Sequence, residues 1–284
     1  MLSIGNDRLG LSMSPDYGAR VLSLTDRSSG RQWLVTGPQS AQTGEDAAYG
    51  ADESVGWDEC FPTILSCDHA AWGGRLRDHG ALWGSKWMVD RADPDCVNTR
   101  LETPGFRFTR RLTVTGAAVV ADYRVTNLGT GQMPYLWSQH CLLATSPGDR
   151  IVLAGHERLR VEDDHFVWPS HQSRDLSIVG PLEEGLALKA YSETPSHASA
   201  AIVGLDGGII LEWEDVPAFG LWLCYGGWPK GNPVHQVALE PTTAAADSLA
   251  AAETTGHART LGVDETHTWS VRMTLTARDE RNLQ

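Results

Sequence analysis

Hydrophobic and polar residues alternate along several well-separated stretches of this chain. From residue 106 to 115, Phe, Phe, Arg, Leu and Val occupy every second position, and polar residues fill the positions between. Gly116 can then turn the chain, and apolar residues resume at every second position from Val119 to Val125. A period of two is the pattern of a β-strand with one buried face, so these stretches predict an antiparallel β-hairpin. Trp269 to Thr276 repeats the alternation near the C-terminus.

Other segments also read as strands, whereas helical periodicity is scarce. Helix is predicted only for residues 243–254, with Gly256 as the C-terminal stop. Strands and helices do not alternate, which disfavours a doubly wound or barrel α/β fold. We therefore predict a single all-β domain over residues 1–284, built as a large antiparallel β-sandwich with few short helices and an irregular loop over residues 36–56. The further strand candidates are residues 9–13, 19–25, 208–213, 219–225 and 235–239.

Composition narrows the classes of function. The 284 residues carry 36 acids and 23 bases, a net charge of -13, and the bases are not clustered. Such a chain is a poor candidate for binding nucleic acid or an anionic membrane. It has no apolar stretch near the roughly 20 residues of a membrane helix and no pattern of a secretory signal. The five cysteines show no CxxC spacing, and we expect free thiols in the cytoplasm.

Candidate chemistry begins with aromatic and acidic residues. Eleven tryptophans are present, and an indole ring is either core or a platform for the apolar face of a sugar ring. Asp58 and Glu59 follow Trp57 in a proline-bounded segment, where adjacent carboxylates suit either a surface loop or the binding of hydroxyl groups. The spacing of Cys60, Cys67, His69 and His79 fits no common zinc pattern. The tryptophans considered as platforms are Trp57, Trp83, Trp137 and Trp228.

Two histidines and one glutamate lie in distinctive surroundings. His79 precedes a glycine, where the backbone can approach a ligand, although such a histidine can equally be structural. His140 lies within an apolar run, so it should be partly buried and paired. As a strand, that run directs Trp137 and Gln139 to one face and His140 to the other. Glu240 precedes Pro241, which should end the strand and leave the carboxylate well placed to point into a cleft, although the motif can equally be an ordinary strand terminus.

The order of these motifs along the chain resembles the galactose mutarotase-like superfamily, the aldose 1-epimerases and their relatives. The resemblance includes an opening Gly18-Ala19-Arg20, the Asp-His-Gly at His79, the strand-borne His140 and the late Leu-Glu-Pro-Thr at Glu240. It implies a β-supersandwich with a sugar cleft across one sheet. It also implies Glu240 as general base and His140 as general acid, with His79 and Arg77, or Arg75, holding the sugar. The family's sugar-binding aspartate has no clear match, and Asp164, Asp206 and Asp215 are considered for it.

The resemblance implies an isomerase that interconverts the α and β anomers of a free monosaccharide without a cofactor. One base, one acid and no other group suffice for ring opening and closure. Two alternatives stay open: a relative that acts on hexose phosphates, which would need converging Arg or Lys side chains, and a non-catalytic carbohydrate-binding or sensing domain. Neither the identity of the sugar nor the oligomeric state follows from the sequence.

Overall fold

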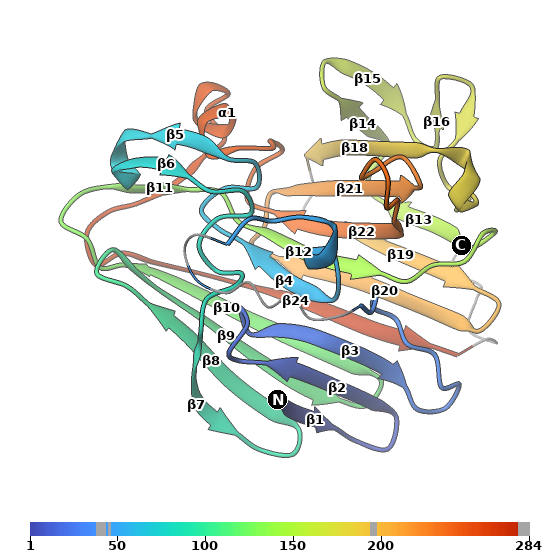
Figure 1. Ribbon diagram of the computed structural model, residues 1–284, viewed down its shortest axis with the longest axis horizontal. Helices are drawn as coiled ribbons and strands as arrows, with labels where there is room; N and C mark the ends of the chain where they lie inside the picture. The colour runs from blue at the N-terminus through green and yellow to red at the C-terminus, as the bar shows by residue number, and fades with distance from the viewer. Residues whose placement is uncertain (38–43, 45–46, 194–197, 278–284) are drawn as a thin grey trace.

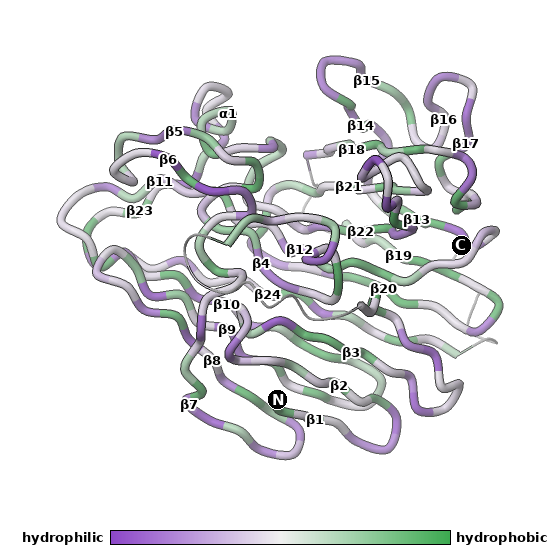
Figure 2. The backbone as a smooth tube through the Cα atoms, in the orientation of Figure 1, coloured by the Kyte–Doolittle hydropathy of each residue, from purple (hydrophilic) through white to green (hydrophobic). Residues whose placement is uncertain are grey.

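The predicted hairpin is the centre of one of two large sheets in the computed structural model, which describes residues 1–37, 44, 47–193 and 198–277. The hairpin consists of β9 (Phe106–Thr115) and β10 (Ala118–Asn127), paired from Thr115↔Ala118 to Phe106↔Asn127. β24 (Thr266–Thr276) pairs with the other edge of β10, which confirms the C-terminal strand. Figure 2 shows apolar and polar segments following one another along these strands.

Two antiparallel sheets face one another (Figure 1). The eight-stranded sheet has the order β13 (Arg150–Ala154), β19 (Ser199–Gly204), β20 (Gly207–Glu214), β24, β10, β9, β8 (Cys96–Glu102) and β7 (Met88–Ala92). The ten-stranded sheet has the order β1 (Leu2–Gly5), β2 (Leu9–Ser14), β3 (Arg20–Asp26), β4 (Trp57–Cys60), β12 (Ser138–Leu143), β22 (His235–Thr242), β21 (Ala218–Tyr225), β18 (Leu186–Glu193), β14 (Arg158–Val161) and β15 (Asp164–Val167).

The remaining elements are short. They comprise the ribbons β5 (Cys67–His69) with β6 (Gly74–Leu76), β11 (Met133–Tyr135) with β23 (Arg259–Leu261), and β16 (Ser170–His171) with β17 (Arg174–Asp175), the helix α1 (Leu249–Thr254), and the 3₁₀ turns η1 (Ala51–Glu53), η2 (Ala70–Trp72) and η3 (Leu182–Glu184). Within the described residues, no helix has the length and hydrophobicity needed to cross a membrane.

The main core lies between the two large sheets. One cluster of buried apolar side chains runs from Ile4 to Leu275 and includes residues of both sheets. Aromatic rings join the layers: Trp137 beside β12 contacts Tyr123 of β10 and Trp269 of β24, with ring centroids 4.8–4.9 Å apart. The structure therefore confirms the predicted all-β antiparallel sandwich.

Two local predictions are corrected. The helix begins at Leu249, not at Thr243, because Thr243 exchanges hydrogen bonds with the backbone of Trp137 and the chain runs on beside β12 before Ser248 caps the helix. Pro241 does not end its strand, since β22 continues to Thr242 and Pro241 pairs with Phe219. An antiparallel residue directs its backbone N–H toward only one neighbouring strand, so a ladder can pass a proline. The predicted stop at Gly256 is confirmed, with φ 75.

Candidate functional site

A row of polar residues crosses the ten-stranded sheet from strand to strand. Asp58 of β4 pairs with His140 of β12. The pairs Ser138↔Thr242 and Leu142↔Ala238 place His140 opposite Glu240 of β22, and Glu240 in turn pairs with Gly220 of β21. Directly paired residues share one face of a sheet. The sheet order thus gathers residues from distant parts of the chain on one face.

This row lies on the face of the sheet that points away from the core. Glu59, the neighbour of Asp58, points the other way and contacts Arg110 and Tyr123 of the eight-stranded sheet. Gln139, the neighbour of His140, likewise contacts Tyr123. The expected alternation along β12 is therefore confirmed, and we call Asp58, His140, Glu240 and Tyr191 of β18, which pairs with Gly220, the polar row.

His140 is held by a buried carboxylate. Its Nδ1 lies 2.7 Å from Asp58 Oδ1, and Asp58 also forms an ion pair with the fully buried Arg20. Burial opposes ionisation of Asp58, but Arg20 and His140 outweigh it and hold the pKa of this carboxyl well below its usual range. The ionised Asp58 fixes the orientation of the imidazole and leaves Nε2 for another partner.

Glu240 is buried and has a cationic partner. Lys189 of β18 forms an ion pair with Glu240 Oε2, and the side chain of Glu240 is only 4% exposed. Gly220 makes room for this pair, because a Cβ there would lie 3.0 Å from Glu240 Oε2 and 3.3 Å from Lys189 Nζ. The absence of a side chain at residue 220 thus lets the carboxylate and the ammonium group meet across β21.

His79 reaches the row from a loop beside the end of β4. Its ring stacks on Tyr49 at 3.6 Å between centroids and lies 4.8 Å from the ring of His140. Its Nδ1 contacts Asp78 Oδ1 at 3.2 Å, and burial lowers the pKa of the imidazole although Asp78 opposes the shift. The glycine after it serves a backbone contact rather than a ligand, since a Cβ at Gly80 would lie 2.0 Å from the Phe61 carbonyl oxygen. His79 therefore lies beside His140.

Several predicted sugar contacts are corrected by burial. Trp57 and Trp137 are fully buried and donate their indole N–H groups to Glu59, which is itself buried between the sheets. A ring or carboxylate enclosed by the core has no free surface for a sugar. Trp83 is also fully buried, packed against Tyr49.

Arg77 is directed at the backbone. Its guanidinium donates to the carbonyl oxygens of Gly80, Trp83 and Gly44 at 2.5–2.6 Å, so its hydrogen bonds hold the loop around His79. Arg75, the other arginine considered, is exposed and pairs with Asp68 at 3.4 Å. Trp228 is half-buried and contacts Trp222 edge-on at 6.5 Å, so stacking on a sugar stays a prediction for Trp228.

A pocket beside the row contains residues that the sequence did not single out. It has a volume of about 510 Å³ and is lined among others by Lys189, Tyr191, Arg160 and Asp247. Tyr191 donates to Asp247 Oδ1 at 2.7 Å. Asp247 follows Glu240 in the chain, whereas the aspartates considered from the sequence, Asp164, Asp206 and Asp215, all precede Glu240.

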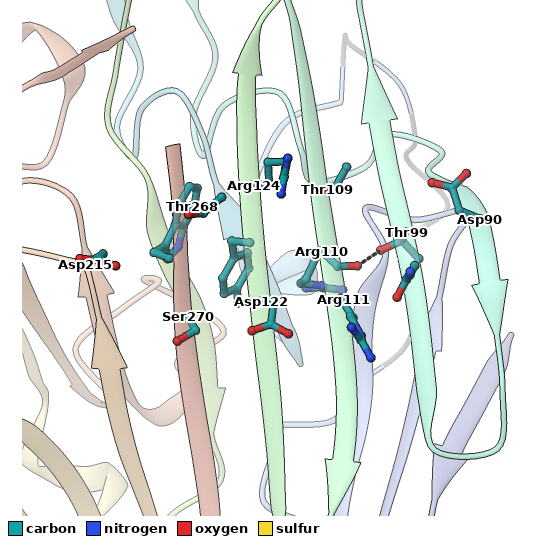
Figure 3. A pocket seen from close by; sticks show the side chains of 13 residues that line it. Asp90, Thr99, Thr109, Arg110, Arg111, Asp122, Arg124, Asp215, Thr268 and Ser270 are labelled. Atoms are coloured by element: carbon teal, nitrogen blue, oxygen red, sulfur yellow. Dashed lines mark hydrogen bonds between the residues drawn. The ribbon is translucent and has the colours of Figure 1, made fainter. Parts of the chain in front are cut away.

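The aspartates considered from sequence lie elsewhere. Asp164 is exposed and contacts His171, and Asp206 is exposed in the turn between β19 and β20. Asp215 lines a hollow on the outer face of the eight-stranded sheet, and Arg111 and Asp122 line the same hollow (Figure 3). That hollow holds none of the predicted catalytic residues.

One group of potential metal ligands occurs among the described residues. Cys60, His79 and His140 offer ligand atoms that all lie within 4.8 Å of one another. Cys67 and His69, the other members of the set considered from sequence, are not part of it. Burial, with Asp58 and Glu240 nearby, raises the pKa of the Cys60 thiol, which disfavours a free thiolate nucleophile there.

Comparison with solved structures decides the fold. The galactose mutarotase related enzyme from Lactobacillus acidophilus superposes with a TM-score of 0.74 at 12% identity, covering 97% of this chain and 97% of that chain. This chain has the galactose mutarotase-like fold. The GalM/aldose epimerase homologue from C. elegans gives a TM-score of 0.70 at 16% identity, covering 97% and 98%. A galactose mutarotase-like protein from Lactobacillus casei gives 0.72 at 14%, covering 97% and 99%.

The likeness is one of structure rather than of sequence. No family model and no curated protein matches the chain. At 12–16% identity the solved structures establish the fold and the divergence of this chain within it. What the site does must be argued from its own residues.

Proposed function

We propose that this protein is an aldose 1-epimerase, which interconverts the α and β anomers of a free monosaccharide. The observation that carries the proposal is the register that sets His140 opposite Glu240 on the outer face of one sheet, with Asp58 behind His140. A carboxylate and an imidazole on neighbouring strands suit a reaction that removes one proton while it adds another.

The reaction needs no redox step and no covalent intermediate with the protein. Glu240 takes the proton of the C1 hydroxyl while His140 donates a proton from Nε2 to the ring oxygen. The bond between C1 and the ring oxygen breaks, which gives the open-chain aldehyde. After rotation about C1–C2, the ring oxygen attacks the other face of the carbonyl, Glu240 returns its proton and His140 recovers its own.

The surroundings of each group suit its role. Asp58 places a carboxylate 2.7 Å from His140 Nδ1, which fixes the orientation of the imidazole. Lys189 places a positive charge beside the Glu240 carboxylate. The His79 ring lies 4.8 Å from the His140 ring by centroids, and Asp247 and Tyr191 present oxygen atoms to sugar hydroxyl groups in the adjoining pocket.

The test is the rate of anomer exchange for a panel of freshly dissolved aldoses, followed by polarimetry. We expect acceleration of at least one aldose at catalytic concentrations of protein. Thermal stabilisation by a sugar without any acceleration would instead indicate a carbohydrate-binding domain. Neither acceleration nor stabilisation by any free sugar would overturn both.

One observation favours a second candidate, an epimerase that takes a hexose phosphate. Arg160, Arg174 and Lys189 all line the 510 Å³ pocket beside Glu240, and phosphate groups are bound by converging cations. These cations have acidic or carbonyl partners, with Arg174 paired to Glu184 and Arg160 bonded to Ala245, so the free-sugar reaction is preferred. Comparison of glucose with glucose 6-phosphate, in the wild type and in Arg160→Met, separates the two.

A cytoplasmic location accords with the state of the cysteines. All five are free and buried in the structure. Free thiols are the usual state in a reducing compartment.

A further inference from the structure

Three soft or borderline ligands meet at the polar row from three parts of the chain. Cys60 ends β4 and lies on the same face as Asp58, two residues away. His140 lies on the neighbouring strand, and His79 comes from the loop that Arg77 holds. Their ligand atoms lie within 4.8 Å of one another.

Both imidazoles are already oriented by carboxylates. Asp58 contacts Nδ1 of His140 at 2.7 Å, and Asp78 contacts Nδ1 of His79 at 3.2 Å. Histidines that bind metals commonly donate one ring N–H to a carboxylate, which fixes the tautomer and raises the basicity of the other nitrogen. Each histidine therefore has its Nε2 available, and the two rings lie 4.8 Å apart by their centroids.

The ligand set matches a specific metal chemistry. One thiolate and two imidazoles suit Zn²⁺, and three protein ligands leave a fourth position for water. Zn–S distances of about 2.3 Å and Zn–N distances of about 2.0–2.1 Å place the ligand atoms of a tetrahedral site about 3.3–3.6 Å apart. Closing the group from the separation in this structure requires movements of about 1 Å, which side-chain rotations can supply.

We propose that Cys60, His79 and His140 form a Zn²⁺ site whose occupation inhibits the protein. On binding, the Cys60 thiol releases its proton to solvent and a sulfur–zinc bond forms, while both histidines bind as neutral imidazoles. A metal on Nε2 of His140 takes the atom that donates the proton to the ring oxygen. The binding site stands independently of the reaction, whereas the inhibition rests on the proposed epimerase function.

The binding test uses Co²⁺ as a spectroscopic substitute for Zn²⁺ on the reduced full-length chain. We expect a sulfur-to-cobalt charge-transfer band in the near ultraviolet and visible bands of tetrahedral cobalt, saturating at one equivalent and abolished by one equivalent of Zn²⁺. Cys60→Ser should lose the charge-transfer band. Cys67→Ser is the matched control, because Cys67 is another buried thiol in the same small core cluster as Cys60, and it should keep the band.

Absence of the band in the wild type, or its persistence in Cys60→Ser, would overturn the proposal. A second variant covers the case in which Cys60→Ser does not fold. His79 has φ 59, a conformation that asparagine tolerates, so His79→Asn preserves the loop. It should keep the sulfur band but weaken Zn²⁺ binding at least tenfold in competition with a chelator, and unchanged affinity would exclude His79 as a ligand.

The inhibition is measured by adding Zn²⁺ and then a chelator during anomer exchange. Wild type and Cys67→Ser should lose activity with Zn²⁺ and regain it with chelator, whereas the ratio of rates with and without Zn²⁺ should stay near one in Cys60→Ser. If no anomer exchange occurs in metal-free protein, the epimerase function fails while the cobalt bands still decide the metal site. If exchange occurs and tight zinc binding leaves it unchanged, the inhibitory role fails.

Discussion

Replacing Asp58 by asparagine removes the negative charge between Arg20 and His140. In the wild type, the Asp58 carboxylate is 2% exposed, contacts His140 Nδ1 at 2.7 Å and pairs with an Arg20 side chain that is 0% exposed. The amide of the Asp58→Asn variant can keep the shape and one hydrogen bond. It leaves a buried guanidinium without its closest counter-charge and His140 without the carboxylate that orients its ring.

The size of the stability loss in Asp58→Asn follows from the burial of the Asp58–Arg20 ion pair. Removing one member of a buried ion pair costs about 3–5 kcal/mol. Arg20 retains weaker partners, since its Nη1 lies 3.8 Å from Glu53 Oε2 and also donates to the Glu53 carbonyl, so we expect about 3 kcal/mol. For a chain of this size that loss lowers the melting temperature by about 5–10 °C. Loss of the supported general acid should slow anomer exchange about 10²-fold or more.

Two assays on one sample measure these effects: thermal unfolding, and anomer exchange by NMR at a temperature where the variant is folded. Asp78→Asn is the control, because Asp78 also contacts a histidine but its side chain is 41% exposed. We expect this control to change stability by less than about 1 kcal/mol. A folded Asp58→Asn variant with exchange within about threefold of wild type would refute the support of His140 by Asp58.

Three further predictions concern residues at or next to the polar row. Lys189→Met should leave the buried Glu240 carboxylate without its cation, so we expect a stability loss of about 3 kcal/mol, measured by thermal unfolding, and an unchanged melting temperature would contradict the importance of this ion pair. Gly220→Ala should slow exchange about tenfold with a stability loss of about 1–2 kcal/mol, because its Cβ would press on the Lys189–Glu240 pair, and unchanged kinetics would show that the pair can move aside. Burial, and to a smaller extent Asp58, raise the pKa of Glu53 from 4.5 to about 7. Between these two pH values the folded chain keeps a proton on Glu53 that the unfolded chain releases. The contribution of Glu53 to the free energy of unfolding therefore falls as the pH rises from about 4.5 to about 7. Glu53→Gln should remove this loss of stability at high pH. We expect the variant to be more stable than wild type by about 1–2 kcal/mol at pH 8, after allowance for solvent screening, but not at pH 4. An equal change in stability at both pH values would contradict the titration of Glu53.

The alternation of residues was enough to predict the central hairpin, several other strands and the antiparallel β-sandwich. β9 and β10 could be found because one face is buried and the other is not, and a glycine lies at their turn. The same alternation puts the side chains of Asp58 and Glu59 on opposite faces of β4, although both were considered from the sequence as carboxylates that bind hydroxyl groups. Asp58 points to His140 and Glu59 points into the core, and only their places in β4 decide which of them does so.

The rest of the site depends on the order of strands, which local pattern does not encode. Lys189 is one polar position in an alternating strand, and nothing around it signals a partner 51 residues away. Its contact with Glu240 arises because β21 lies between their strands and carries a glycine at the crossing point. Tryptophan content likewise could not distinguish the enclosed Trp137 from the half-buried Trp228.

The central claim is that Glu240 and His140 catalyse ring opening as a base and an acid. The most direct test is two-dimensional exchange NMR of the α and β anomer signals of the best aldose, with wild type, Glu240→Gln, His140→Asn and the exposed control Glu214→Gln. We predict exchange in wild type and Glu214→Gln, and exchange at the uncatalysed rate in Glu240→Gln although sugar signals still broaden on binding. Exchange at the wild-type rate in Glu240→Gln or His140→Asn would contradict the account.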